Sequence, residues 1–202
     1  MQDISLMNFI SFILVIGIST ISAQLPLLGP CPHDVFTMRN FSFMQFLGVW
    51  HEQYRYFIRG EEGHTCVVIS LENNGDGAIA CSFWSYDECL NKDTVMKGVG
   101  KLGGRSRDEG NLLISFDYGP ELPFWIIDTD YVSYAAVWGC NDHYSINSQY
   151  AWILTRDVCP GPEAVRKAMT AFRINGIVTR PLMRTLDNVC FPEDSDESDY
   201  DW

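Results

Sequence analysis

The sequence predicts an all-β fold of eight short strands followed by one α-helix, and three observations support this prediction. Between residues 48 and 156, segments rich in β-branched and aromatic residues alternate with clusters of turn residues. The run NNGDG at 73–77 is typical of a hairpin turn. After the last of these segments, apolar residues recur at helical spacing.

The eight expected strands are short and are separated by short connections. They span residues 48–56, 66–72, 78–86, 94–102, 111–118, 124–128, 133–140 and 149–156. Strands of this kind form either a sandwich or an up-and-down barrel, and composition alone does not choose between the two.

One helical pattern follows the strands. Pro162 near the first helical position and Glu163 at the positive helix end mark its start, and Gly176 marks its end. Its apolar face consists of Val165, Ala168, Met169, Phe172 and Ile177. We expect this helix to be a structural buttress, and a single helix after eight strands favours a barrel with the helix packed on its wall.

The chain divides into three expected parts. An apolar run from Phe9 to Ile18, followed by small residues up to Ala23, predicts a secretory signal peptide over residues 1–23. A membrane anchor is the alternative, but the run is shorter than the about 20 apolar residues that a span needs. We expect one barrel domain over 24–191, which begins with an irregular Pro-rich segment at 24–32, and an acidic disordered tail over 192–202.

Secretion changes how the seven cysteines are interpreted. In an oxidising compartment thiols pair, and because seven is odd, at least one thiol stays free or bonds to another chain. No two cysteines form a CxxC motif, so we expect no metal site. The sequon Asn40-Phe41-Ser42 predicts glycosylation of Asn40. The net charge of −12 argues against nucleic acid and anionic lipid surfaces as partners.

Three short patches occur in a characteristic order. They are Gly48-Val49-Trp50, WIIDTDY at 125–131 and AWILTRD at 151–157. In this order and at these spacings, with a helix after the last, they resemble the three signature regions of the lipocalin family. The resemblance is greatest to its apolipoprotein D, insecticyanin and bilin-binding group, because of CP at 31–32, YVSYAAVWGC at 131–140 and TLDNVC at 185–190.

The resemblance implies an eight-stranded antiparallel barrel that is closed at one end and holds a small apolar ligand. Eight strands leave an interior wide enough for side chains or one small ligand. The family pattern also implies that the tryptophan of the first patch lies across the closed end, under the arginine of the third, beside a tight turn. The residues of this structural motif are Gly48, Trp50, Asp128, Thr129, Asp130 and Arg156.

The family pattern further implies two disulfides, Cys31–Cys140 and Cys66–Cys190. Cys81, Cys89 and Cys159 depart from this pattern. Cys81 and Cys89 lie at the two ends of one expected strand, too far apart to bond directly. In an up-and-down order Cys81 and Cys159 both lie toward the closed end, so we expect these two to pair and Cys89 to be the odd thiol. A disulfide-linked or non-covalent oligomer remains open.

Side-chain alternation and family alignment together predict the lining of the barrel. Alternation from Arg156 places Leu154 inside, and alternation from Trp50 places Glu52 and Tyr56 inside. The predicted ligand contacts are Tyr54, Val67, Ile69, Ile79, Phe83, Phe116, Phe124, Ile126, Val137, Tyr150 and Trp152, with Cys81 and Ala135 on the same wall. Each of these is equally interpretable as a core residue that touches only protein.

This lining predicts an extracellular carrier of a small hydrophobic ligand, such as a bilin, carotenoid, retinoid, sterol, fatty acid or odorant, and not an enzyme. No cofactor is expected apart from such a pigment or lipid. One alternative is a secreted interaction module that acts through loops and the tail. Another is a thiol-dependent enzyme using Cys81, but the sequence places no histidine as its base.

Overall fold

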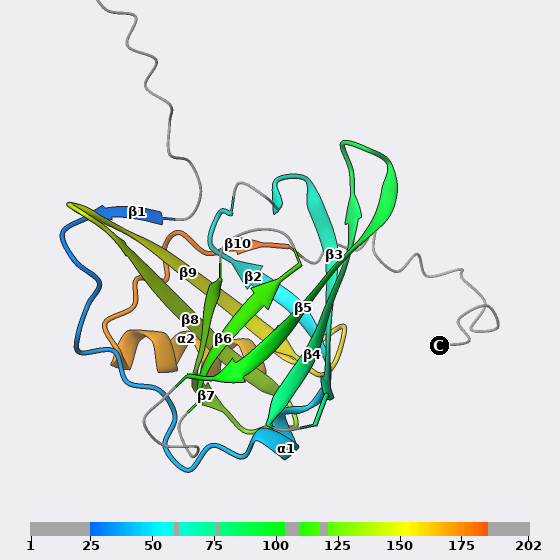
Figure 1. Cartoon of the computed structure of the whole chain (residues 1–202), viewed down its shortest axis with the longest axis horizontal. Helices are drawn as coiled ribbons and strands as arrows, with labels where there is room; N and C mark the ends of the chain where they lie inside the picture. The colour runs from blue at the N-terminus through cyan, green and yellow to red at the C-terminus, as the bar shows by residue number, and fades with distance from the viewer. Residues whose placement is uncertain (1–24, 59–60, 76, 104–109, 118–120, 186–202) are drawn as a thin grey trace, which may run out of the picture.

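Eight antiparallel strands pair in chain order and close on themselves in the computed structural model, which describes residues 25–58, 61–75, 77–103, 110–117 and 121–185 (Figure 1). Closure comes from pairing of the last of these strands with the first, so the predicted up-and-down barrel is confirmed. The strands are β2 (Gly48–Arg55), β3 (His64–Asn73), β4 (Ala78–Asp87), β5 (Lys92–Leu102), β6 (Asn111–Phe116), β7 (Leu122–Thr129), β8 (Tyr134–His143) and β9 (Ile146–Thr155).

Alternating burial explains why these segments form barrel strands. In β4, Ile79, Cys81 and Phe83 are buried, while the residues between them are more exposed. In β8 and β9 both faces are buried, since a helix covers their outer side. The two strands therefore have continuous apolar runs instead of a clean alternation.

A short strand that the sequence did not predict extends the sheet beyond β9. β1 (Leu25–Leu28) pairs with residues 146–149 of β9, which β2 does not reach. The expectation that residues 24–32 are all irregular is therefore wrong. Backbone groups on that free edge of β9 need partners, and β1 supplies them. At the other edge, β10 (Met183–Arg184) pairs with the end of β2.

The predicted helix is present as α2 (Pro162–Ile174), and it packs on β7, β8 and β9. Its buried residues are Ala164, Ala168, Ala171 and Phe172. The three alanines let the helix approach the strands closely, and Phe172 packs into the resulting outer cluster together with Trp138 and Ile153. The helix therefore buttresses one wall of the barrel. No helix among the described residues is long and apolar enough to cross a membrane.

The disulfide Cys31–Cys140 is confirmed, and it ties the segment after β1 to β8. Cys66 is also disulfide-bonded, but its expected partner Cys190 lies outside the described residues, so that pairing stays a prediction. The suggested Cys81–Cys159 pair is wrong, because both thiols are free. Cys81 is buried in the interior, whereas Cys159 is exposed beyond the end of β9. The expected signal peptide and acidic tail likewise lie outside the described residues.

Candidate ligand-binding site

One end of the barrel is filled by the indole of Trp50. The ring is fully buried, and its Nε1 donates a hydrogen bond to the carbonyl oxygen of Phe46 at 2.9 Å. Phe46 belongs to α1 (Phe43–Phe46), the short helix before β2, and its ring lies 5.0 Å from that of Trp50. We call this the α1 end, and the opposite end, where β3 begins and β4 meets β5, the distal end (Figure 1).

Arg156 lies over the outer face of Trp50, with its guanidinium carbon 3.7 Å from the ring centroid. Its nitrogens also donate to the carbonyl oxygens of Tyr131 (3.0 Å), Val49 (2.7 Å) and Leu47 (2.8 Å). One side chain thus joins the β7–β8 turn, β9 and the start of β2. Gly48 permits this approach, since its φ is 101° and an added Cβ would lie 3.1 Å from Arg156 Nη1.

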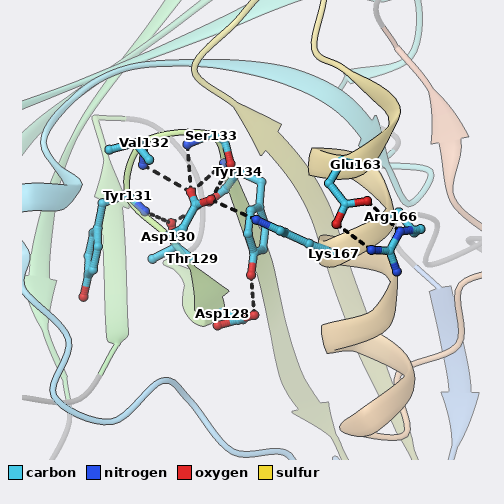
Figure 2. Close-up of polar contacts among 10 residues, drawn as sticks. All are labelled: Asp128, Thr129, Asp130, Tyr131, Val132, Ser133, Tyr134, Glu163, Arg166 and Lys167. Carbon is cyan, nitrogen blue, oxygen red and sulfur yellow. Dashed lines mark hydrogen bonds and ion pairs between the residues drawn. The ribbon is translucent and has the colours of Figure 1, made fainter.

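The three predicted turn residues hold the β7–β8 turn together (Figure 2). Asp130 Oδ1 accepts backbone hydrogen bonds from residues 132–134, the shortest being 2.7 Å from Ser133. Burial alone would raise the pKa of Asp130, but hydrogen bonds from Ser133 and the turn amides outweigh burial and hold that pKa below its usual value. Thr129 Oγ1 donates to the carbonyl of Tyr134 at 2.5 Å, and Asp128 accepts from the Tyr134 hydroxyl at 2.6 Å.

The same turn is connected to α2. Lys167 Nζ lies 3.6 Å from Asp130 Oδ2 and 5.6 Å from the centroid of the Tyr134 ring (Figure 2). On the exposed side of the helix, Arg166 pairs with Glu163, which only steadies the first helical turn. These contacts are structural, because they involve the turn and the outer wall and not the interior.

Most of the predicted lining residues lie together inside the barrel. Buried members of this interior cluster are Val67, Ile69, Ile79, Cys81, Phe83, Phe124, Ile126, Ala135, Val137, Tyr150, Trp152 and Leu154, with Phe116 partly buried against them. They come from β3, β4, β6, β7, β8 and β9. The structure thus brings them to one place, and their contact with a ligand remains a proposal.

Aromatic rings dominate one side of the interior. The rings of Tyr150 and Trp152 on β9 stack with centroids 5.8 Å apart and an interplanar angle of 9°. Phe124 on β7 lies 5.5 Å from Trp152. Flat ring faces of this kind favour contact with flat or conjugated molecules.

The predicted inward positions of Tyr54 and Tyr56 are wrong. A register shift between Glu52 and Tyr54 in the β2–β9 pairing adds one residue to β2 and reverses the side that later residues face. Tyr54 then pairs with Ile153 and packs in the outer cluster. Tyr56 is buried in that cluster too, and its hydroxyl donates to the carbonyl of Val178.

The same shift turns Arg55 inward, which the sequence-based alternation missed. Arg55 pairs with Trp152 and Glu52 pairs with Leu154, and both of these partners line the interior. Arg55 is 4% exposed and Glu52 is 1% exposed. Arg55 Nη1 donates to Glu52 Oε1 at 2.8 Å, and its Nε lies 3.5 Å from Glu61 Oε2. We call Glu52, Arg55 and Glu61 the Arg55 cluster.

Further polar groups lie at the distal end, on the strands next to the Arg55 cluster. His64 at the start of β3 places Nδ1 2.7 Å from Ser85 Oγ and Nε2 3.6 Å from Asp87 Oδ2. Ser85 in turn lies 2.8 Å from Thr94. The strand predicted from the sequence began at residue 66, so His64 was not expected on it. The interior is therefore apolar near α1 and polar on the β2–β5 side of the distal end.

Burial shifts the titration of the two carboxyls in the Arg55 cluster. It raises the pKa of Glu52, opposed by the charge and hydrogen bond of Arg55. Burial, together with the nearby Glu52, raises the pKa of Glu61 to about 8 against the opposing effect of Arg55. Since the carboxyl of Glu52 accepts a hydrogen bond from Arg55 and the carboxyl of Glu61 does not, Glu61 holds the proton near neutral pH.

The alternative of a thiol-dependent enzyme is not supported by the environment of Cys81. Burial raises the pKa of this thiol to about 11, so it stays protonated at neutral pH. Its Sγ lies 3.7 Å from the carbonyl oxygen of Ile79. Within the described ranges no group of three His, Cys, Asp or Glu side chains is arranged to hold a metal ion.

Both sequence and structure match known proteins. The model of the lipocalin / cytosolic fatty-acid binding protein family matches residues 47–188. Apolipoprotein D of Bos taurus is 29% identical over 176 residues, which cover 82% of this chain and 86% of the relative. Insecticyanin of Manduca sexta superposes with a TM-score of 0.68 at 24% identity, covering 80% of this chain and 88% of the other. Lobster apocrustacyanin A1 superposes with a TM-score of 0.63 at 18% identity, covering 78% and 93%. The chain therefore belongs to the lipocalin family.

Proposed function

We propose that the protein carries one small, predominantly apolar molecule in the interior of its barrel. The observation that supports this most strongly is the set of rings from Phe124, Tyr150 and Trp152 on one inner side. An apolar interior with a few polar groups at one end is typical of small-molecule sites. Membership of a family whose description includes fatty-acid binding supports the same function.

Within this function, we infer a ligand that contains a flat ring or a conjugated chain. Such a molecule would stack on Trp152 and Tyr150 and reach the aliphatic side chains nearer α1, such as Ile69 and Ile79. A bilin, carotenoid, retinoid, sterol or ring-containing odorant fits this description better than a simple aliphatic chain does.

We infer that the carrier acts outside the cell. The disulfide Cys31–Cys140 is of the kind that persists in oxidising compartments, and the apolar run at 9–18 has the composition of a secretory signal. The sequon residue Asn40 is exposed, as a glycosylation acceptor must be.

The test is to purify the protein from its natural source, extract it with organic solvent, and analyse the extract by mass spectrometry and absorption. We expect one small molecule per chain, lost when Tyr150 and Trp152 are both replaced by alanine. The matched control replaces Trp84 and Tyr144, two exposed outer rings, and should keep the molecule bound. A chain that carries no ligand, or one whose ligand survives removal of the inner rings, would contradict the proposal.

A second candidate function, binding of a protein partner through the outer wall, is favoured by one observation. Trp84 on β4 is 45% exposed and pairs with Val95 on β5, which is 38% exposed. Val99, farther along β5, is exposed as well. If this surface is the functional one, Trp84→Ser abolishes partner binding while Trp152→Ala leaves it unchanged.

A further inference from the structure

The Arg55 cluster contains one positive group and two acidic groups at the distal end of the barrel. Arg55 is hydrogen-bonded through Nη1 to Glu52, and through Nη2 to the carbonyl oxygens of Glu61 (2.6 Å) and His64 (2.9 Å). These three hydrogen bonds use three of the five guanidinium donors and hold the group in place.

The carboxyl of Glu61 has a positive charge nearby but no hydrogen bond to that group. Glu61 Oε2 and Arg55 Nε are buried and, among the described residues, have no hydrogen-bond partner. They lie 3.5 Å apart, which is an ion-pair distance and not a good hydrogen bond. With both carboxylates ionised, the cluster is one positive charge short, and a buried unmatched charge is costly. A proton on Glu61, whose pKa burial raises to about 8, removes that unmatched charge.

The aromatic wall begins beside this cluster. Trp152 pairs directly with Arg55 across the β2–β9 ladder, and its ring stacks on that of Tyr150. Carboxylates next to the faces of indole and phenol rings are the groups that recognise organic ammonium ions, through charge and through cation–π attraction. An anionic head group would instead meet two carboxyls and an arginine that is already paired.

We propose that the distal half of the interior binds the ammonium head of an amphipathic amine, with the ammonium between Glu61 and the Trp152–Tyr150 rings and the apolar part directed toward α1. This rests on the proposed carrier function and narrows its ligand class. The ammonium replaces the proton on Glu61: the carboxyl gives that proton to solvent, and the bound cation restores the charge balance of the cluster. Fatty acids are disfavoured at this end.

The test compares three probes that share one ring system and differ in the head group: 2-(1-naphthyl)ethylamine, 2-(1-naphthyl)ethanol and 3-(1-naphthyl)propionate. Their dissociation constants for the full chain are measured at pH 8 by isothermal titration calorimetry. We expect the amine to bind at least about tenfold more tightly than the alcohol, and the carboxylate more weakly than either.

Two variants of the full chain localise the effect. Glu61→Gln keeps the shape of the side chain and removes its charge, so it should weaken the amine about tenfold and leave the alcohol unchanged. Glu62→Gln makes the same change in net charge at an exposed neighbouring position and should leave all three probes unchanged. Circular dichroism verifies that each variant is folded.

The outcomes separate the two proposals. Binding of the alcohol without preference for the amine, or equal loss of amine affinity in both variants, overturns the ammonium site and leaves the carrier function standing. Failure of all three probes to bind overturns both. Preference for the amine that disappears only in Glu61→Gln supports the ammonium site.

Discussion

Two arginines act at opposite ends of the barrel, and their surroundings determine what each does. Arg156 faces an indole ring and neutral carbonyl oxygens, so it joins chain segments without bringing in a second charge. Its contact with Trp50 is a cation–π interaction, a type that contributes about 0.5–2 kcal/mol to the stability of the folded state. Arg55 faces two largely buried carboxyls at the distal end, where charge is unfavourable unless it is matched. The first arginine therefore stabilises the fold, and the second gives the interior its polarity.

Replacing Arg156 with lysine tests its structural role. A lysine keeps the charge but cannot donate to several carbonyl oxygens in the fixed geometry of a guanidinium. We expect Arg156→Lys to lower the free energy of unfolding by about 2–3 kcal/mol, measured by urea denaturation. Arg166→Lys on the exposed side of α2 is the control and should leave the free energy of unfolding nearly unchanged. Equal effects in the two variants would refute this role.

The raised pKa of Glu61 predicts how stability depends on pH. The charged groups that act on this carboxyl are Glu52 and Arg55, both from β2. Because the folded state holds the Glu61 proton up to about pH 8 and the unfolded state releases it near its ordinary value, the folded state binds more protons between these two pH values. The stability contributed by this group is complete below the ordinary pKa and is lost as the pH rises to about 8.

We therefore expect the midpoint of urea unfolding to fall between pH 5 and pH 8 in the natural chain and to fall less steeply in Glu61→Gln. In Glu62→Gln the midpoint of urea unfolding should depend on pH as it does in the natural chain. A pH profile that is the same in Glu61→Gln and Glu62→Gln would show that Glu61 is not buried in its neutral form.

At the scale of elements, β2 determines both the closed end and the polar wall. Its first half carries Gly48 and Trp50 under Arg156, and its second half, after the register shift at Glu52, turns Arg55 inward. A single extra residue in the β2–β9 ladder separates these two functions. Without that shift, the interior would contain Tyr54 in place of Arg55.

Gly48→Ala tests the approach of Arg156 to β2. The backbone of Gly48 has a φ of 101°, and the new methyl group would lie 3.1 Å from Arg156 Nη1. We expect a loss of about 1–3 kcal/mol in unfolding free energy by thermal or urea denaturation. Gly103→Ala meets only ordinary contacts of 3.7 Å or more and serves as the control. If the two substitutions have equal effects, the close approach at Gly48 is unimportant for stability.

For the whole molecule, the disulfide Cys31–Cys140 links residues 109 positions apart. In the chain-entropy account, such a link stabilises the folded state by about 4–5 kcal/mol, because it restricts the unfolded chain. We expect the double variant with serine at both positions to lose most of that free energy, measured by urea denaturation without reductant. Cys159→Ser, which removes an exposed free thiol, should have little effect. A double variant as stable as the natural chain would contradict this account.

Much of the architecture followed from local patterns in the sequence. Local patterns predicted the strands from β3 to β9 and the helix α2. The inward faces of β3 to β8 were taken from alignment with the lipocalin family, and that of β9 from side-chain alternation. Two features depended on pairing between distant segments and left no local signal. The register shift in β2 reversed Tyr54 and Arg55, and the free edge of β9 recruited β1.

The central claim, that the barrel interior holds the ligand, is tested most directly by titrating the full chain with the fluorescent apolar probe N-phenyl-1-naphthylamine. The account predicts one saturable site per chain, about tenfold weaker in Trp152→Ala, whose indole lies inside, and unchanged in Trp84→Ala, whose indole is on the outer wall. Absence of saturable binding, or a loss of affinity that is equal in the two variants, would contradict it.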